Sequence, residues 1–362
     1  MMEMEVKLED VCERGTSNLK QSDIVEIDGD YPIYGASGYI GNVDFYHQEN
    51  PYVAVVKDGA GIGRTTLHPA KSSVIGTMQY LIPKENVIPE YLYYVVSYMH
   101  LEKYFTGATI PHIYYKDYKN EKFNLDPLDR QKTIVDTLGK CEAVIKARKR
   151  ELELMDILIK ARFVEMFGDP VSNSNGLPES TLPELGEFGR GISKHRPRND
   201  PKLLGGDYPL IQTGDVANAG LYITSYSSTY SELGLKQSKM WDNGTLCITI
   251  AANIAKTSIL KFDACFPDSI VGFNANEKTN NIFIHYWFSF FQAILESQAP
   301  ESAQKNINLK TLSELKVIVP VKDKQDKFVE FIKQVDKSKV AVQKALDETQ
   351  MLFDSLMQKY FG

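Results

Sequence analysis

Residues 129–168 read DRQKTIVDTLGKCEAVIKARKRELELMDILIKARFVEMFG, and this stretch decides the fold of the chain. It contains no proline, and most of its residues are strong helix formers. Apolar residues recur at alternating intervals of four and three, the spacing of a coiled-coil seam. The seam positions are Ile134, Leu138, Cys141, Ile145, Leu152, Met155 and Ile159, with Arg148 interrupting the series. The pattern predicts one long helix that packs against another helix.

The same helix occurs a second time, 194 residues further along the chain. Gln131 and Phe167 of the first copy correspond to Gln325 and Phe361 of the second. The second seam consists of Phe328, Ile332, Val335, Val342, Leu346 and Phe353, with polar residues at Lys339 and Thr349. Because each copy closes one half of the same chain, we expect the two helices to pair antiparallel. A coiled coil that only dimerises the protein is the alternative.

The sequence ahead of each helix follows one plan. Residues 1–125 begin with short segments of β-branched and aromatic residues separated by glycine-containing turns, a pattern typical of β-hairpins. A helical segment follows Pro89, and a last strand precedes the long helix. Residues 181–320 repeat this order, with an apolar helix at 282–296 and a strand at 315–320. Shared order along the chain makes accidental similarity improbable.

The predicted fold class is α+β. Two β-rich mixed domains form a pseudo-twofold arrangement, and two long helices in an antiparallel coiled coil separate them. The predicted boundaries are residues 1–125 for the first domain, 126–168 for the first helix, 169–180 for a linker, 181–320 for the second domain and 321–362 for the second helix.

Composition sets limits on the function. With 362 residues, of which 43% are hydrophobic and 24% charged, the chain is typical of globular proteins. Its formal net charge of −6 argues against indiscriminate coating of nucleic acid but allows a local basic face. The first ten residues do not resemble a secretory signal, and the apolar run at 282–295 is short for a membrane span. We therefore expect a cytoplasmic protein with reduced thiols and no membrane contact.

The motifs of common enzymes are missing from the sequence. Residues 59–63 read GAGIG and resemble a dinucleotide-binding loop, but the third glycine comes one residue too early. A glycine-rich turn between two strands is the preferred interpretation. The six histidines show no metal-ligand spacing, and the four cysteines form no CxxC pair. We expect a non-catalytic chain without a metal or cofactor of its own.

Basic, aromatic and amide residues in the loops are the candidates for DNA contact, because they bind phosphates, stack on bases or read base edges. In the first domain they are Lys57, Arg64, Thr109, His112, Tyr114 and Lys116. In the second domain they are Lys194, Arg196, Arg198, Lys256, Gln304, Lys305 and Asn306. The alternative is that the basic loop, residues 190–202, is merely solvated and that the tyrosines only pack the domain.

Taken in order, four motifs resemble the specificity subunits of type I restriction-modification systems. They are VAVVKDGAGIG at 53–63, TGATIP at 106–111, PLDRQ at 127–131 and FVEMFGDP at 163–170. The second half departs from the pattern, with SAQK at 302–305 in place of Gly-x-Thr-x-Pro and KDKQ at 322–325 in place of LDRQ. These departures concern the reading loop of the second domain more than the fold.

The resemblance implies a non-catalytic reader of double-stranded DNA. Each domain would recognise one half of a bipartite target, while the helices set the spacer and dock two methyltransferase subunits. Motor-nuclease subunits would join this core. Adenine methylation and DNA cleavage, together with S-adenosylmethionine, ATP and Mg, would then belong to the partner subunits. Two alternatives stay open: a reader with a different partner arrangement, and a coiled-coil scaffold that presents two β-rich domains to protein partners without binding DNA.

Overall fold

The computed structural model describes residues 4–24, 29–106, 111–251, 253–298 and 307–362. The chain forms two compact units. The first unit comprises Met1–Arg150 with Gln343–Gly362, and the second comprises Glu151–Val342. Each unit therefore combines one β-rich domain with the beginning of one long helix and the end of the other.

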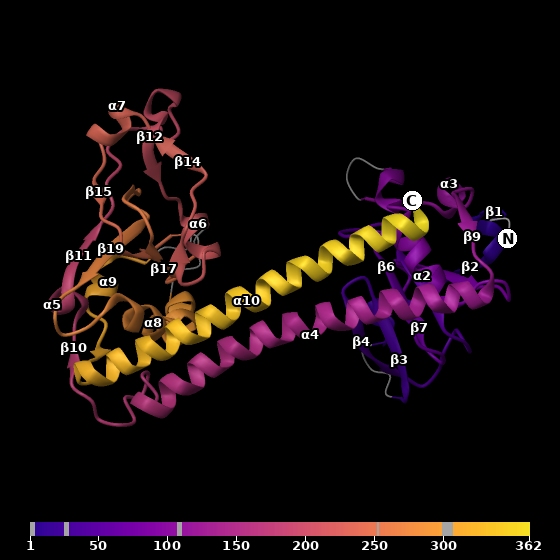
Figure 1. Cartoon of the computed structure of the whole chain (residues 1–362), viewed down its shortest axis with the longest axis horizontal. Helices are drawn as coiled ribbons and strands as arrows, with labels where there is room; N and C mark the ends of the chain where they lie inside the picture. Colours follow the sequence, from indigo (N-terminus) through magenta and orange to yellow (C-terminus); the bar gives the residue numbers. More distant parts are fainter. Residues whose placement is uncertain (1–3, 25–28, 107–110, 252, 299–306) are drawn as a thin grey trace. The chain divides into compact units, whose positions relative to one another are not determined.

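The two long helices are α4 (Leu128–Phe167) and α10 (Lys322–Phe361), drawn in magenta and yellow in Figure 1. In the first unit, Ile134 and Leu138 near the start of α4 share a buried core with Met357 near the end of α10. In the second unit, Phe163 near the end of α4 packs against Phe328 near the start of α10, with ring centroids 5.4 Å apart. The helices therefore run antiparallel, and the predicted coiled coil is confirmed.

Most predicted seam positions are buried. On α10 the exposed fraction is 0% for Phe328 and Ile332 and 8% for Leu346. Lys339, a predicted polar position of the seam, forms an ion pair of 2.5 Å with Asp156 of α4. Heptad spacing thus identified the packed face correctly, including a position where charge replaces apolar contact.

The first domain is built around a four-stranded sheet in the order β2-β8-β5-β6. Its strands are β2 (Cys12–Thr16), β8 (Met78–Pro83), β5 (Tyr52–Val56) and β6 (Thr65–His68). A three-stranded sheet contains β4 (Gly38–Val43), β3 (Tyr31–Gly35) and β7 (Ser73–Val74), and β1 (Met4–Lys7) pairs with β9 (Lys122–Leu125). The helices are α1 (Leu8–Val11), α2 (Pro89–Tyr98), α3 (Tyr115–Tyr118) and the 3₁₀ helices η1 (Gln21–Ile24) and η2 (Leu101–Tyr104). Helix α2 packs on β5, β6 and β8, so the YVAVV sequence of β5 is wholly buried.

The second domain repeats this plan with a five-stranded sheet in the order β11-β19-β16-β17-β13. Its strands are β11 (Gly186–Arg190), β19 (Ile270–Ala275), β16 (Leu246–Thr249), β17 (Thr257–Leu260) and β13 (Tyr222–Ile223). A four-stranded sheet contains β14 (Ser228–Tyr230), β12 (Leu204–Leu210), β18 (Ala264–Cys265) and β15 (Met240–Trp241), and β10 (Glu179–Ser180) pairs with β20 (Val317–Ile318). The helices are α5 (Leu182–Leu185), α6 (Thr213–Asn218), α7 (Glu232–Lys236), α8 (Asn281–Gln298), α9 (Leu309–Ser313) and the 3₁₀ helix η3 (Pro201–Leu203).

The order β2-β8-β5-β6 of the first domain corresponds to β11-β19-β16-β17 of the second. In each domain a short helix, α1 or α5, leads into the first of these strands. A longer helix, α2 or α8, follows the sheet and packs on it. The duplication inferred from the sequence is therefore a duplication of topology. Among the residues that the structure describes, no helix has the length and apolar character to cross a membrane.

Candidate nucleic-acid interface

In the first domain, four predicted residues gather where strand β5 ends. The backbone N–H of Ile113 donates to the carbonyl of Lys57 at 3.0 Å, and Gly59 donates to Pro111 at 2.9 Å. These bonds place His112 beside Asp58, whose carboxylate contacts both the His112 ring and, at 3.0 Å, the Lys57 ammonium. Asp58 lies beside a predicted residue but was not itself predicted.

Tyr114 extends this cluster outward. Its ring lies 4.0 Å from the His112 ring and 5.2 Å from the Lys116 Nζ, and the residue is 48% exposed. An exposed tyrosine next to lysines can hydrogen-bond to the sugar-phosphate backbone of DNA while the ammonium groups neutralise phosphates. Lys57, His112, Tyr114 and Lys116 therefore form one surface, which we call the first-domain cluster. Thr109 lies outside the described residues.

The glycine-rich turn joins two antiparallel strands. Gly59, Gly61 and Gly63 all have positive φ values, of 83°, 85° and 80°, which explains why glycine is needed at these positions. The turn leads into strand β6, whereas a dinucleotide-binding loop would lead into a helix. Arg64 is exposed, and its guanidinium folds back over Gly61. The turn thus positions the exposed Arg64 side chain at the surface.

In the second domain, the basic loop is held at several points. The amides of Lys194 and His195 both donate to Gln237 Oε1, at 2.7 and 3.0 Å. The guanidinium of Arg196 lies 3.3 Å from Asp268, and that of Arg198 contacts the other oxygen of the same carboxylate. All three predicted residues, Lys194, Arg196 and Arg198, are exposed. The structure brings them together and adds Asp268, which no local sequence signal indicated.

Lys256 occupies the place of Arg64 in the second domain. The amide of Thr249 donates to the carbonyl of Lys256 at 2.9 Å, just as Val56 donates to Arg64 at 2.9 Å in the first. Gln304, Lys305 and Asn306 lie outside the described residues. The amide of Ile307, the next described residue, donates to the carbonyl of Ile250 at 2.9 Å. This bond repeats the one between Ile113 and Lys57, so Ile307 and Ile113 are attached to equivalent positions of the two sheets.

The buried titratable groups are structural. His68 is 5% exposed and stacks on Tyr52 at 5.2 Å, and burial lowers its pKa to about 4, so the ring is neutral near pH 7. Burial likewise raises the pKa of the Cys12 thiol to about 12. Within the described part of the chain, no three His, Cys, Asp or Glu side chains are arranged to hold a metal ion. His68 and Cys12 both lie in the interior of the first domain.

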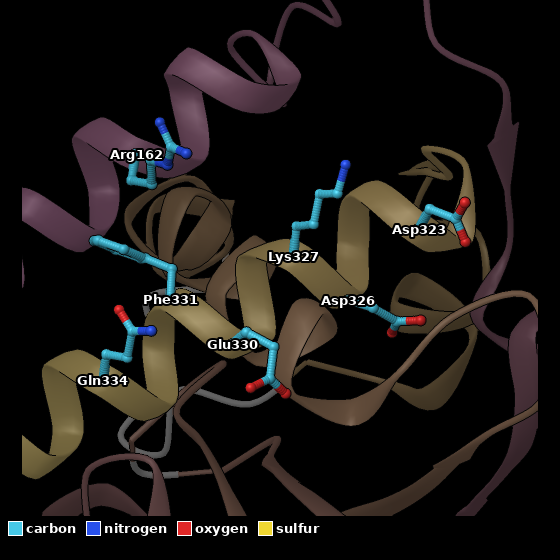
Figure 2. Close-up of a pocket in the computed structure, with 7 residues that line it drawn as sticks. All are labelled: Arg162, Asp323, Asp326, Lys327, Glu330, Phe331 and Gln334. Atoms are coloured by element: carbon cyan, nitrogen blue, oxygen red, sulfur yellow. The ribbon is translucent and has the colours of Figure 1, made fainter.

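A groove of about 540 Å³ lies between α4 and α10 in the second unit (Figure 2). It is lined by Arg162, Asp323, Asp326, Lys327, Glu330, Phe331 and Gln334. Asp326 pairs with Lys322 at 2.5 Å, and Glu330 pairs with Lys333 at 2.6 Å, each within one helical turn. Such pairs are typical of a solvated helix face, and the groove is suited to contact rather than to chemistry.

Each long helix carries an exposed apolar pair at equivalent positions. Ile157 and Leu158 of α4 are 54% and 50% exposed, and Met351 and Leu352 of α10 are 63% and 53% exposed. The two pairs are 194 residues apart, the period of the repeat. Both copies of the repeat therefore leave a pair of apolar side chains outside the seam and exposed.

Comparisons of the sequence and of the fold with known proteins point to the same family. Residues 2–154 and 179–349 match the family model of the type I restriction modification DNA specificity domain. A putative type I restriction enzyme MjaX specificity subunit from Methanocaldococcus jannaschii is 22% identical over 297 residues, covering 76% of this chain and 68% of that protein. The fold resembles a type I restriction-modification S subunit from M. genitalium, with a TM-score of 0.61, 15% identity, and 99% and 96% of the two chains covered. It also resembles a chain from a structure on complex assembly of the type I R-M system, with a TM-score of 0.57, 15% identity, and 99% and 97% covered.

Proposed function

The chain belongs to the type I restriction-modification DNA specificity family, and from this premise we propose that it selects the bipartite DNA target of a methyltransferase–restriction complex. The observation that carries the proposal is that the family model matches both halves of the chain separately, at residues 2–154 and 179–349. Two specificity domains in one chain are what recognition of two half-sites requires. Family members choose the target and leave the chemistry to other subunits.

The surfaces support contact with double-stranded DNA. The first-domain cluster offers ammonium groups beside an exposed tyrosine, and the basic loop offers Arg196 and Arg198 side by side. Arginine and lysine bind phosphates and read guanine, so both surfaces have the chemistry of sequence recognition. In our proposal each surface contacts one half-site. The chain then acts in the cytoplasm, where that DNA is located.

The helices supply the remaining functions in our proposal. The antiparallel pair sets the spacer between the half-sites, because each recognition domain is attached to the beginning of one helix. The exposed pairs Ile157-Leu158 and Met351-Leu352 dock two methyltransferase subunits, one for each copy of the repeat. Motor-nuclease subunits join this core. Those partners carry S-adenosylmethionine, ATP and Mg, and they perform adenine methylation and cleavage.

Co-expression tests this function directly. The chain is produced with its methyltransferase subunit in a host without adenine methylation, and methylated adenines are mapped by single-molecule sequencing. We expect one bipartite motif with a fixed spacer. The methyltransferase subunit alone and the chain alone serve as controls, and both should leave the DNA unmethylated. Methylation by the chain alone, or the same motif without the chain, would contradict the proposal.

A further inference from the structure

A fully buried glutamine lies at the junction between the first domain and its helix. Gln131, in the first turn of α4, has an exposed fraction of 0%. Its Nε2 donates to the carbonyls of Asn86 and Asp126 at 3.0 and 2.8 Å, and its Oε1 accepts from the amide of Ile88 at 3.0 Å. One side chain thus binds the start of the helix to the loop ahead of α2 and to the segment that follows β9.

The second unit contains the same junction. Gln325 of α10 is also 0% exposed, and its Nε2 donates to the carbonyls of Lys278 and Pro320 at 3.0 and 2.8 Å. Its Oε1 accepts from the Thr279 hydroxyl at 2.9 Å. In both copies one bonded carbonyl lies five residues before the glutamine and the other lies in the loop ahead of the domain helix. We call Gln131 and Gln325 the junction glutamines.

A second attachment follows along the first helix. The carboxylate of Glu142 accepts hydrogen bonds from Tyr94 at 2.8 Å and from Tyr93 at 3.5 Å, both on α2. Glu142 lies about three helical turns beyond Gln131, so the two residues share one face. Two attachments on one face fix both the position of α2 and its rotation about the long helix.

Hydrogen bonds fix this junction more sharply than apolar packing. Apolar contact is not directional, whereas a buried amide that makes three hydrogen bonds tolerates little rotation. Removing the amide leaves carbonyls and an N–H unpaired away from water, which is energetically costly. A loosened junction is therefore free to change its angle to restore those hydrogen bonds.

We propose that the junction glutamines are positioning residues that fix the angle of each recognition domain on its helix and thereby restrict the accepted spacer length. This inference rests on the proposed function. One additional base pair moves a half-site by about 3.4 Å and rotates it by roughly 35° about the DNA axis. A domain held on its helix by the bonds of its junction glutamine cannot follow that movement, whereas a domain with a loosened junction can.

The test measures spacer selectivity in the assembled methyltransferase complex. A plasmid library carries the cognate half-sites with spacers from three base pairs shorter to three longer, and methylation of each is counted by sequencing. Gln131→Met and Gln325→Met keep the side-chain volume and remove the amide. We expect methylation of spacers one base pair off, relative to the cognate spacer, to rise about tenfold in each variant, which corresponds to about 1.4 kcal/mol of lost discrimination. The base preference within each half-site should stay the same.

Two core variants separate positioning from stability. Ile33→Ala and Ile211→Ala remove buried side chains from apolar clusters in which neither junction glutamine takes part. They should lower the melting temperature and leave the spacer ratio unchanged. If a methionine variant does not assemble, Gln131→Asn or Gln325→Asn, which keeps the amide on a shorter side chain, is measured in its place.

Unchanged spacer ratios in the junction variants would overturn the inference, as would equal loosening by the core variants. Both outcomes leave the proposed function intact. If the unmodified complex itself accepts every spacer equally, the proposed ruler function fails, and this inference fails with it.

Discussion

At the scale of single residues, Asp268 joins two arginines that the sequence presents as independent cations. Arg196 and Arg198 lie about half exposed on either side of its carboxylate. Exposed ion pairs contribute roughly 0–1 kcal/mol to stability, so the main effect of this arrangement is orientation. A DNA phosphate, like the carboxylate, accepts paired hydrogen bonds from a guanidinium and can replace it.

Replacing both arginines with glutamine should weaken DNA binding and reduce its dependence on salt. Each phosphate contact contributes about 0.9 to the slope of log affinity against log salt, so the double variant should lose roughly 2 units of slope. Fluorescence anisotropy of the assembled complex on a DNA duplex, between 50 and 200 mM salt, measures this slope. Glutamine at Lys324 and Lys327, two exposed lysines of α10, is the matched control and should leave it unchanged. An unaltered slope in the arginine variant would remove these residues from the interface.

Local sequence patterns indicate the basic and aromatic candidates one by one, but they do not indicate the anions that lie beside them. His112 and Tyr114 were proposed because aromatic and basic residues alternate locally, and Lys57 because it flanks the glycine-rich turn. Asp268 was missed because its partner Arg196 is 72 positions away in the sequence. Pairing at that distance depends on the fold, and no spacing rule indicates it.

At the scale of elements, the long helices could be predicted because a heptad repeat is local and recurs over forty residues. The small strands could not. β15 and β18 have two residues each, which is too short for an alternating pattern. They form because β18 pairs with β12 on one side and with β15 on the other. Strands such as β5, with five apolar residues in a row, are intermediate: a strand is indicated, but so short a run is also compatible with a buried helix.

The exposed apolar pairs give a prediction for the helices. Leu158→Glu places a charge in the apolar contact proposed for α4, and Leu352→Glu does the same on α10. Burying such a charge without a partner is costly, so each variant should lose one methyltransferase subunit and the double variant both. Native mass spectrometry of the co-purified complex counts the subunits. Lys160→Glu, which changes an exposed polar residue of the same helix, is the control, and this variant should retain two methyltransferase subunits. Full occupancy in the double variant would place docking elsewhere.

At the scale of the whole molecule, each unit buries its own apolar core and holds its own recognition domain. The first junction differs from the second because, among the described residues, the Gln131 side chain bonds to backbone atoms alone, namely the carbonyls of Asn86 and Asp126 and the amide of Ile88. A contact with backbone does not depend on the side chains of the domain. The Gln131 attachment can therefore be kept when the domain is replaced, whereas the Glu142 attachment also needs the tyrosines at positions 93 and 94.

Exchanging residues 1–125 for those of another family member should consequently change one half-site and nothing else. The backbone bonds to Gln131 survive the exchange, and the spacer should stay the same when the incoming domain also places two tyrosines against Glu142, as Tyr93 and Tyr94 do here. The second domain keeps its own half of the target. Sequencing of methylated adenines in cells with the hybrid complex reads both halves and the spacer at once. The reciprocal exchange of residues 181–320 is the control and should change the other half. A hybrid that alters both halves would show that the domains do not read independently, whereas an altered spacer would show that the angle depends on domain side chains beyond the backbone contacts of Gln131.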